Sequence, residues 1–238
     1  MARIFITGSA DGLGRLTAQT LLGDGHDVIV HARSTERLTA VQDLIDRGAS
    51  AVTGDLAEQD QTRAVAEQAN RLGPLDAVIH NAGVYSGPQV MAVNIIAPYL
   101  LTALLQRPRR LVYLSSGMHR GGRPDLQSLT RGGSYSDSKL FVTTLAVALA
   151  RRWPDVSSNA VDPGWVPTRM GGPGAPDDLR LGHLTQEWLA TGDEPGALTS
   201  GGYWHHQRRQ DPHPATGDKH FQYGMLDALA HVTGTTLS

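Results

Sequence analysis

Short apolar runs alternate with longer stretches of helical periodicity almost to the end of the chain. A run of a few apolar residues is typical of a buried strand, and an apolar stripe at every third or fourth position is typical of a helix. The runs predict strands near residues 3–7, 27–31, 50–53, 75–79, 110–115, 157–161 and 202–206. The stretches between them predict helices near residues 13–23, 36–47, 59–71, 88–105, 134–152, 177–190 and 217–232. This alternation predicts an α/β protein, a doubly wound Rossmann domain whose seven-stranded, mostly parallel sheet carries helices on both faces.

The chain shows no sign of division into separate domains. It contains no internal repeat and no linker rich in Pro, Gly or Ser, so we expect residues 1–238 to form a single domain. Two long loops interrupt the alternation, one at 117–133 and one rich in Gly and Pro at 169–176. Open α/β sheets bind ligands at the carboxyl ends of their strands, so both loops are expected to border a binding site.

A glycine-rich turn joins the first predicted strand to the first predicted helix. The strand Ile4-Phe5-Ile6 leads directly into Thr7-Gly8-Ser9-Ala10-Asp11-Gly12-Leu13-Gly14. Glycines at such a turn let the backbone approach a pyrophosphate, which then rests on the helix N-terminus. The spacing is GxxxGxG rather than the GxGxxG of the commoner fingerprint. A plain tight turn is the alternative, but the position between strand and helix favours a dinucleotide site.

The end of the second predicted strand bears on the choice between NAD and NADP. A carboxylate near this point holds the ribose hydroxyl of NAD, whereas an arginine suits the 2′-phosphate of NADP. Here the strand ends in Ala32 and Arg33, with no acid, and Arg15 in the preceding helix is a second candidate contact. The alternative is that Arg33 and Arg15 are ordinary surface charges. We interpret the pattern as a preference for NADP.

A tyrosine and a lysine lie four residues apart at the start of the helix predicted at 134–152. Only two lysines occur among the 21 Lys and Arg residues of the chain, and one of them is Lys139, four positions after Tyr135. Lysine is a compact point charge on a flexible stem, unlike the fork of arginine. Because residues i and i+4 share one face of a helix, the phenol and the ammonium are expected side by side.

Composition narrows the possible functions. The chain is 40% hydrophobic with a formal net charge of −2, which indicates neither a nucleic-acid nor a membrane partner. The absence of cysteine excludes disulfides, Cys-ligated zinc and thiol catalysis. No apolar run approaches a membrane span, and the first strand leaves no room for a signal peptide, so a cytoplasmic protein is expected. The C-terminal histidines match no zinc pattern, so we expect no metal site.

Seven motifs occur in the order found in the short-chain dehydrogenase/reductases, and the chain resembles that family over nearly its whole length. They are Thr7-Gly8-x-x-x-Gly12-x-Gly14, Asp55-Leu56, Asn81-Ala82-Gly83, Asn94, Ser115-Ser116, Tyr135-x-x-x-Lys139 and Pro163-Gly164-x-Val166-x-Thr168. Ala32-Arg33 resembles the NADP-preferring members. The resemblance implies these cofactor-binding residues: Gly8, Ser9, Asp11, Gly12, Leu13, Gly14, Arg15, Arg33, Asp55, Leu56, Asn81, Ala82, Gly83, Tyr135, Lys139, Pro163, Gly164, Val166 and Thr168.

The resemblance also implies a catalytic set consisting of Asn94, Ser116, Tyr135 and Lys139. Reducing a ketone or aldehyde needs a hydride on carbon, supplied by NADPH, and a proton on oxygen. A free tyrosine has a pKa near 10, which Lys139 and the oxidised nicotinamide are expected to lower. Ser116 would hydrogen-bond the carbonyl oxygen, with Ser115 as its competitor, and Asn94 would anchor a water for proton relay. Structural roles for Ser116 and Asn94 are the alternatives.

Departures from the family pattern indicate the kind of pocket. His80 stands where the family often has asparagine, and we interpret it as a structural residue. The spacing of nineteen positions from Ser116 to Tyr135 resembles the retinol-dehydrogenase-like branch. The substrate loop, about 165–176, is short, which predicts an open pocket for bulky carbonyl compounds. Candidate wall residues are Tyr85, His119, Trp165 and Met170.

The helices predicted at 88–105 and 134–152 are apolar on more than one face. Such helices need a second burial partner. Family members dimerise through these helices, which predicts a homodimer or homotetramer; a thicker single-chain core is the alternative. We predict an NADPH-dependent carbonyl reductase acting on a small molecule. Three alternatives are an alcohol dehydrogenase working in the oxidative direction, a non-catalytic NADPH sensor or scaffold, and a nucleotide-sugar dehydratase or epimerase, for which the chain leaves little room.

Overall fold

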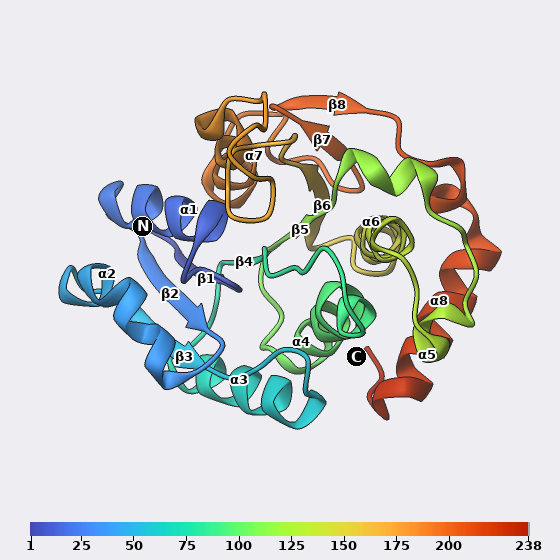
Figure 1. Cartoon of the computed structure of the whole chain (residues 1–238), viewed down its shortest axis with the longest axis horizontal. Helices are drawn as coiled ribbons and strands as arrows, with labels where there is room; N and C mark the ends of the chain where they lie inside the picture. Colours follow the sequence, from blue (N-terminus) through green and yellow to red (C-terminus); the bar gives the residue numbers. More distant parts are fainter. Residues whose placement is uncertain (238) are drawn as a thin grey trace.

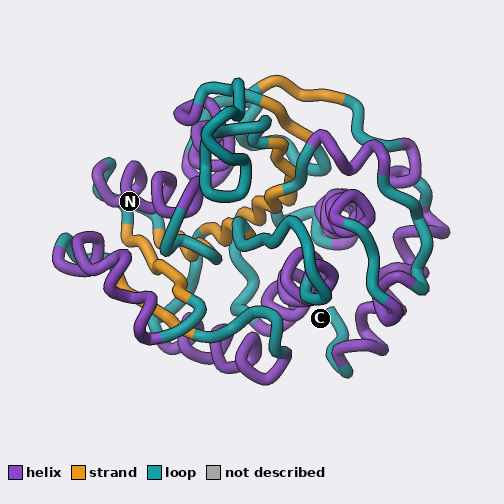
Figure 2. Tube along the Cα trace, in the orientation of Figure 1, coloured by secondary structure: helices purple, strands orange, loops and turns teal. Residues whose placement is uncertain are grey.

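The computed structural model describes residues 1–237, and within them eight strands form a single sheet in the order β3-β2-β1-β4-β5-β6-β7-β8. Figure 2 shows the strands as one curved band across the molecule, with helices on both sides. Neighbouring strands are parallel except for β7 and β8, which are antiparallel. The strands are β1 (Arg3–Ile6), β2 (Asp27–Ala32), β3 (Ser50–Thr53), β4 (Ala77–His80), β5 (Arg110–Leu114), β6 (Ser157–Asp162), β7 (Tyr203–His205) and β8 (Arg208–Gln210).

The α/β Rossmann prediction is confirmed, and the strand count is corrected from seven to eight. The additional strand, β8, follows β7 through a two-residue hairpin whose residues His206 and Gln207 have φ of 48° and 60°. All three residues of β8 are exposed and polar, so no alternation of apolar positions marked it as a strand. Backbone pairing with β7, rather than side-chain burial, forms this edge strand.

Twelve helical segments connect and flank the strands within the described residues (Figure 1). Two departures from the predicted helices are a 3₁₀ segment that replaces most of the helix at 36–47, and a π turn that opens the helix at 88–105. The segments are α1 (Gly12–Gly23), η1 (Thr35–Val41), α2 (Gln42–Asp46), α3 (Gln59–Arg71), η2 (Ala92–Ile96), α4 (Ala97–Leu104), η3 (Gly117–Gly121), α5 (Ser128–Arg131), α6 (Tyr135–Arg152), α7 (Leu179–Thr191), η4 (Pro214–Gly217) and α8 (Lys219–Thr233).

The period of two along each strand divides the core between the two faces of the sheet. In β1, Ile4 and Ile6 belong to the core cluster that includes residues of α1, α2 and α7, whereas Phe5 between them belongs to the cluster on the other face, which includes residues of α3, α4, α6 and α8. All three side chains are fully buried. This arrangement fixes the sheet between two helical layers and directs the carboxyl ends of β1 to β6 toward one edge.

The apolar faces of α4 and α6 are covered by the carboxyl end of the same chain. The rings of Phe141 in α6 and Phe221 in α8 lie 5.5 Å apart. The Tyr99 hydroxyl of α4 donates to Thr235 O at 2.9 Å, and an Arg152 guanidinium nitrogen donates to Leu237 O at 2.9 Å. The second burial partner that the sequence requires is therefore present within one chain, and the homo-oligomer stays a prediction.

Candidate active site

A cleft of about 730 Å³ lies at the carboxyl ends of the strands. Its lining comes from the loops that follow β1 to β6 and from the start of α6, as expected for an open α/β sheet. Predicted cofactor residues that line it are Gly8, Asp11, Gly12, Leu13, Arg33, Asp55, Leu56, Asn81, Ala82, Gly83, Tyr135, Lys139, Pro163 and Thr168. Five other predicted cofactor residues are not part of this lining, namely Ser9, Gly14, Arg15, Gly164 and Val166.

The glycine-rich turn forms a cradle that fits a diphosphate. Gly8 has φ of 64°, and a Cβ added there would lie 2.8 Å from Ala82 Cα, so only glycine is accommodated. Gly12 opens α1 with φ of 54°, and the Asp11 carboxylate caps the helix by accepting from Gly12 N at 2.8 Å. The resulting helix N-terminus presents unpaired N–H groups and a positive end, both of which suit a phosphate.

His31 at the end of β2 holds this turn in place, and the sequence analysis gave it no role. Its Nδ1 accepts from Gly8 N at 3.0 Å, and its Nε2 donates to Gly54 O at 2.8 Å. These partners fix the neutral tautomer with the proton on Nε2. Burial lowers the pKa of His31, so the ring stays neutral at pH 7. The only sequence signal was a histidine inside the otherwise apolar run Val28-Ile29-Val30-His31-Ala32.

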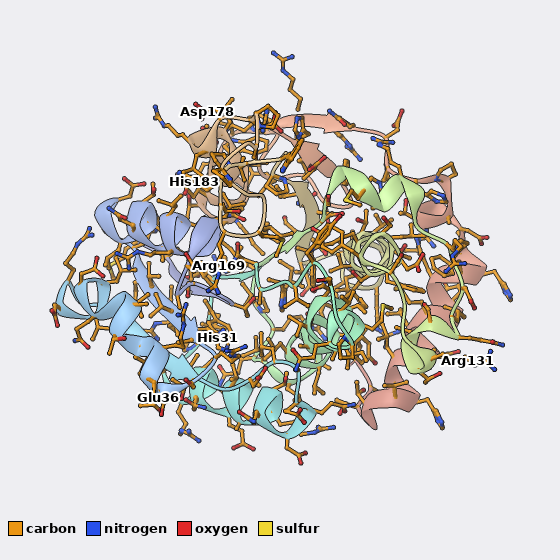
Figure 3. The ribbon with its side chains drawn as sticks, in the orientation of Figure 1. His31, Glu36, Arg131, Arg169, Asp178 and His183 are labelled. Carbon is orange, nitrogen blue, oxygen red and sulfur yellow. The ribbon has the colours of Figure 1, made fainter. Side chains whose placement is uncertain are left out.

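Three arginines face the cleft, and the sequence analysis identified one of them. Arg33 lines it as predicted, together with Arg37 of η1 and Arg169 of the loop after β6 (Arg169 is labelled in Figure 3). Arg15 does not line it, because its guanidinium donates to both Asp43 carboxylate oxygens at 3.0 and 2.9 Å. Asp43 lies 28 residues away in the chain, so spacing gave no sign of this ion pair.

Tyr135 and Lys139 lie side by side at the start of α6, where a capping box formed by Ser134 and Asp137 fixes the first turn. Lys139 Nζ is 5.4 Å from the centroid of the Tyr135 ring and donates to Leu114 O at 2.7 Å. Burial lowers the pKa of Lys139 to about 8. The same ammonium thus lies beside the Tyr135 phenol and is held by the backbone at the end of β5.

The pKa of Tyr135 departs from the expectation. Burial raises it to about 12, and a hydrogen bond with the Ser116 hydroxyl opposes that rise without cancelling it. Without a bound cofactor, the protein therefore does not lower the pKa of Tyr135 as the sequence analysis expected. Burial of the phenol is the largest influence on this pKa, and the Lys139 ammonium donates to Leu114 O instead.

The two adjacent serines have different surroundings. Ser115 is buried, and its hydroxyl pairs with Thr143 Oγ1 at 2.6 Å inside the core. Ser116 is partly exposed, accepts from Met118 N at 3.2 Å and lowers the pKa of Tyr135 by hydrogen bonding. Ser115 belongs to the cleft lining and Ser116 does not, but Ser116 is the serine that acts on the phenol, and its catalytic role stays a prediction.

Asn94 lies on the π turn η2 and is fully engaged by protein groups. Its Oδ1 accepts from Val84 N at 2.9 Å, and its Nδ2 donates to Val84 O at 3.0 Å and to Ser138 Oγ at 2.9 Å. Both amide protons are used, which leaves one lone pair on Oδ1. Asn94 therefore ties the loop after β4 to α6, and its role in holding a water stays a prediction.

Of the four candidate wall residues, two line the cleft and two do not. Tyr85 and Met170 line the cleft, and the Tyr85 ring lies 4.9 Å from the Tyr135 ring. Trp165 is 60% exposed but outside the lining, with its Nε1 donating to Gly171 O at 2.8 Å. The prediction for His119 is wrong, because that side chain is fully buried.

His119 instead supports the backbone beside the site. Its Nε2 accepts from His213 N at 3.0 Å, so its Nδ1 carries the proton and donates to Ser116 O at 2.8 Å. Burial lowers its pKa, which keeps the ring neutral. His80 is likewise structural, as expected: it stacks on Tyr113 and burial lowers its pKa to about 3.

These features define a dinucleotide-dependent oxidoreductase, and comparison with known proteins gives the family. The profile of the short chain dehydrogenase family matches residues 2–178. The chain belongs to the short-chain dehydrogenase/reductase family, whose members are NAD(P)-dependent oxidoreductases. Within residues 1–237, no helix is both long and apolar enough to cross a membrane, and no three His, Asp or Glu side chains are placed to hold a metal.

Several relatives share almost the full length of the chain. The short-chain dehydrogenase chyC of Penicillium rubens is 37% identical over 100% of this chain and 99% of its own. A Streptomyces protein provisionally named daunorubicin C-13 ketoreductase DnrU is 31% identical over 98% of this chain and 93% of its own. Mouse retinol dehydrogenase 14 is 32% identical, but over only 71% of this chain and 62% of its own. The likeness to the retinol-dehydrogenase-like branch is thus partial.

Solved structures confirm the fold. An uncharacterised protein of Mycobacterium paratuberculosis superposes with a TM-score of 0.82 at 22% identity, over 100% of this chain and 95% of its own. A short chain dehydrogenase of Shigella flexneri, complexed with NADP, gives 0.71 at 23% identity, over 87% of this chain and 97% of its own.

Proposed function

We propose that the protein is an NADPH-dependent reductase that converts a ketone or aldehyde into an alcohol. The observation that carries this proposal is the position of Tyr135 and Lys139 in the lining of the cleft, with Lys139 Nζ 5.4 Å from the centroid of the Tyr135 ring. The Ser116 hydroxyl acts on the same phenol, and two hydroxyls on one oxygen would stabilise the charge that develops on a carbonyl. DnrU is named for the reduction of a ketone, which agrees with this reaction class.

The cofactor preference rests on the charges around the cleft. Arg33 and Arg37 follow β2, where the family places the adenosine ribose, and the lining there carries no acid from β2. Guanidinium groups at this position favour the extra phosphate of NADP. Arg169, on the loop after β6, also lines the cleft, and its neighbour Thr168 lies 3.8 Å from the Cβ position of Gly12 in the glycine-rich turn. The bound cofactor would supply the hydride.

The protein supplies the proton and the electrostatic stabilisation. Tyr135 donates its proton to the carbonyl oxygen as negative charge develops there, and Ser116 donates a hydrogen bond to the same oxygen. With its pKa raised by burial, the Tyr135 hydroxyl is protonated at pH 7, and it needs a nearby cation to stabilise the phenolate once the proton has left. The ammonium of Lys139 then stabilises the phenolate that forms.

The alternatives differ from this proposal in measurable ways. An alcohol dehydrogenase would catalyse the same reaction in both directions, and it would turn over an alcohol with NADP⁺ faster than the matching ketone with NADPH at neutral pH. A sensor or scaffold would bind NADPH without turnover of any compound. A nucleotide-sugar dehydratase or epimerase would convert its substrate with no net consumption of NADPH.

The test is NADPH consumption across a panel of ketones, aldehydes and quinones. The Tyr135→Phe variant should lose about a hundredfold to ten-thousandfold in turnover, the usual contribution of a general acid. Tyr223→Phe is the matched control, because Tyr223 is exposed on α8 away from the cleft. NADPH binding should survive in both variants. Equal turnover by Tyr135→Phe and the unmodified protein would contradict the proposed acid.

A further inference from the structure

A polar cluster next to the proposed reaction centre has no part in the mechanism above. Its centre is Asp162, the last residue of β6. Tyr203 Oη donates to Asp162 Oδ2 at 3.0 Å, and Gly164 N donates to Oδ1 at 3.0 Å. His205 Nδ1 lies 3.7 Å from Oδ2. These contacts hold the carboxylate in one orientation.

The sheet places this carboxylate beside Ser116. Strands β5 and β6 are neighbours, and Leu114 lies opposite Val161. The segment Ser115-Ser116 that follows Leu114 therefore lies next to Asp162, which follows Val161. A Cβ added at Gly117 would lie 3.1 Å from Asp162 Oδ2. The carboxylate therefore contacts the backbone immediately after Ser116, and its charge acts on both Tyr135 and Lys139.

Asp162 keeps capacity for further hydrogen-bond donors. An ionised carboxylate offers about four lone-pair sites, and the two direct donors, Tyr203 and Gly164, fill two of them. The side chain is 14% exposed, and although Asp162 is not part of the cleft lining, the next residue, Pro163, is. The negative charge of Asp162 also opposes formation of the Tyr135 phenolate. Proton transfer from Tyr135 is therefore harder for a substrate that has no group to interact with this charge.

We propose that Asp162 accepts a hydrogen bond from a hydroxyl or ammonium group on the carbon next to the reacting carbonyl. The preferred substrates are accordingly α-hydroxy or α-amino ketones. Either group donates a hydrogen bond to the carboxylate, and an ammonium also offsets its negative charge when the proton leaves Tyr135. This inference rests on the proposed carbonyl reduction and adds its substrate class.

The rest of the substrate is apolar. Tyr85, Met118 and Met170, on the loops after β4, β5 and β6, are 54%, 44% and 49% exposed. Large apolar side chains with this exposure at the carboxyl edge of the sheet favour an aryl or alkyl group on the other side of the carbonyl. Aryl ketones are therefore suitable probes.

The test compares four ketones with NADPH: acetophenone and its 2-hydroxy, 2-amino and 2-methoxy derivatives. The methoxy compound withdraws electrons like the hydroxy compound but has no proton to donate. We expect kcat/KM at least about tenfold higher for the hydroxy and amino ketones than for the methoxy ketone, as for a hydrogen bond to a charged group. Equal values for the three substituted ketones would overturn the inference without requiring any variant.

The Asp162→Asn variant separates recognition from structure. It keeps the side-chain shape, and binding of NADPH by the variant shows that the fold is retained. The amino ketone should lose its advantage entirely and the hydroxy ketone part of it, because Asn still accepts but carries no charge. The change should appear in the ratio between ketones, whereas a structural role of Asp162 would lower all four equally and refute the assignment.

Tyr203→Phe is the companion variant. It removes one donor to Asp162 but leaves the carboxylate, so the preference among the four ketones should persist. Loss of preference here, with Asp162 intact, would assign the selection to Tyr203 instead. Failure to reduce any ketone or aldehyde of the wider panel would count against the proposed function, whereas reduction without preference counts only against the role of Asp162.

Discussion

The cofactor side and the substrate side of the cleft are built in different ways. On the cofactor side, the glycine-rich turn between β1 and α1 supplies most of the cradle from a contiguous stretch of chain, and His31 fastens it. On the substrate side, Ser116 follows β5, Asp162 ends β6 and Tyr203 begins β7, and the sheet brings these three residues close together. Figure 1 shows β5 and β6 side by side near the middle of the molecule and β7 beyond them toward its upper edge.

The difference follows from what each side recognises. A diphosphate is bound largely by backbone N–H groups at a helix N-terminus, and glycine spacing is enough to shape such a site. A particular carbonyl compound is distinguished by side chains placed on loops. Changes on the first side should thus impair binding of every dinucleotide, and changes on the second should alter choice among substrates.

Lys139 lies where the two sides meet, and its loss should have the largest effect. Lys139→Met should lower kcat by about a hundredfold or more, because the phenolate of Tyr135 loses its nearby cation. Burial lowers the pKa of Lys139 to about 8, so the ammonium is present below that pH and lost above it. Reduction by the unmodified protein should fall as pH rises through about 8. A flat pH–rate profile to pH 10 would contradict the role of this ammonium.

Gly8→Ala should come next, with NADPH binding weakened by about tenfold to a hundredfold. The positive φ of 64° and the contact with Ala82 Cα both oppose a side chain, and strain of this kind costs about 1–3 kcal/mol. Gly25→Ala is the matched control, because Gly25 has φ of 81° with open space around its Cβ position. It should lower stability without changing the dissociation constant for NADPH, measured by fluorescence titration. Equal weakening by both variants would show that the cradle at Gly8 has no special role.

Arg33→Ala should affect one dinucleotide and spare the other. Loss of a charge-assisted hydrogen bond to phosphate weakens binding by about tenfold to a hundredfold, so NADPH should suffer and NADH should change little. Arg15→Ala is the control, since its guanidinium is held by Asp43 outside the lining. A larger loss of NADPH affinity in Arg15→Ala than in Arg33→Ala would restore the sequence-based role of Arg15.

Acid should lower the stability of the whole fold rather than change one side of the cleft. His31, His80 and His119 have pKa values lowered by burial, that of His80 to about 3, whereas an unfolded histidine titrates near 6.5. Between these values the unfolded chain binds more protons, so stability is lost as pH falls below about 6.5. His80 alone should contribute about 2 kcal/mol of loss between pH 7 and pH 5.

Urea unfolding at the two pH values measures this loss. His80→Asn should weaken the dependence of the unfolding free energy on pH, because an amide does not titrate. His220→Gln, at an exposed position of α8, should leave this dependence unchanged. An identical dependence on pH in all three proteins would contradict the assignment to His80.

The sequence by itself determined the α/β class, seven of the strands, the glycine-rich turn, and the pairing of Tyr135 with Lys139. Each depends on local periodicity or spacing, since a strand repeats every two residues and a helix brings i and i+4 together. The glycine-rich turn could also be predicted from the sequence, because only glycine fits its backbone conformation and close contacts.

Only the tertiary structure decided which side chains the long loops and distant strands bring together. In the structure Arg15 pairs with Asp43, and His119 accepts a hydrogen bond from His213 N. Tyr203 donates to Asp162, 41 positions away in the sequence. The tertiary structure also added β8, whose polar residues form a strand through backbone pairing alone. Contacts of this kind depend on the register between strands and on loop paths, which no periodicity along the chain encodes.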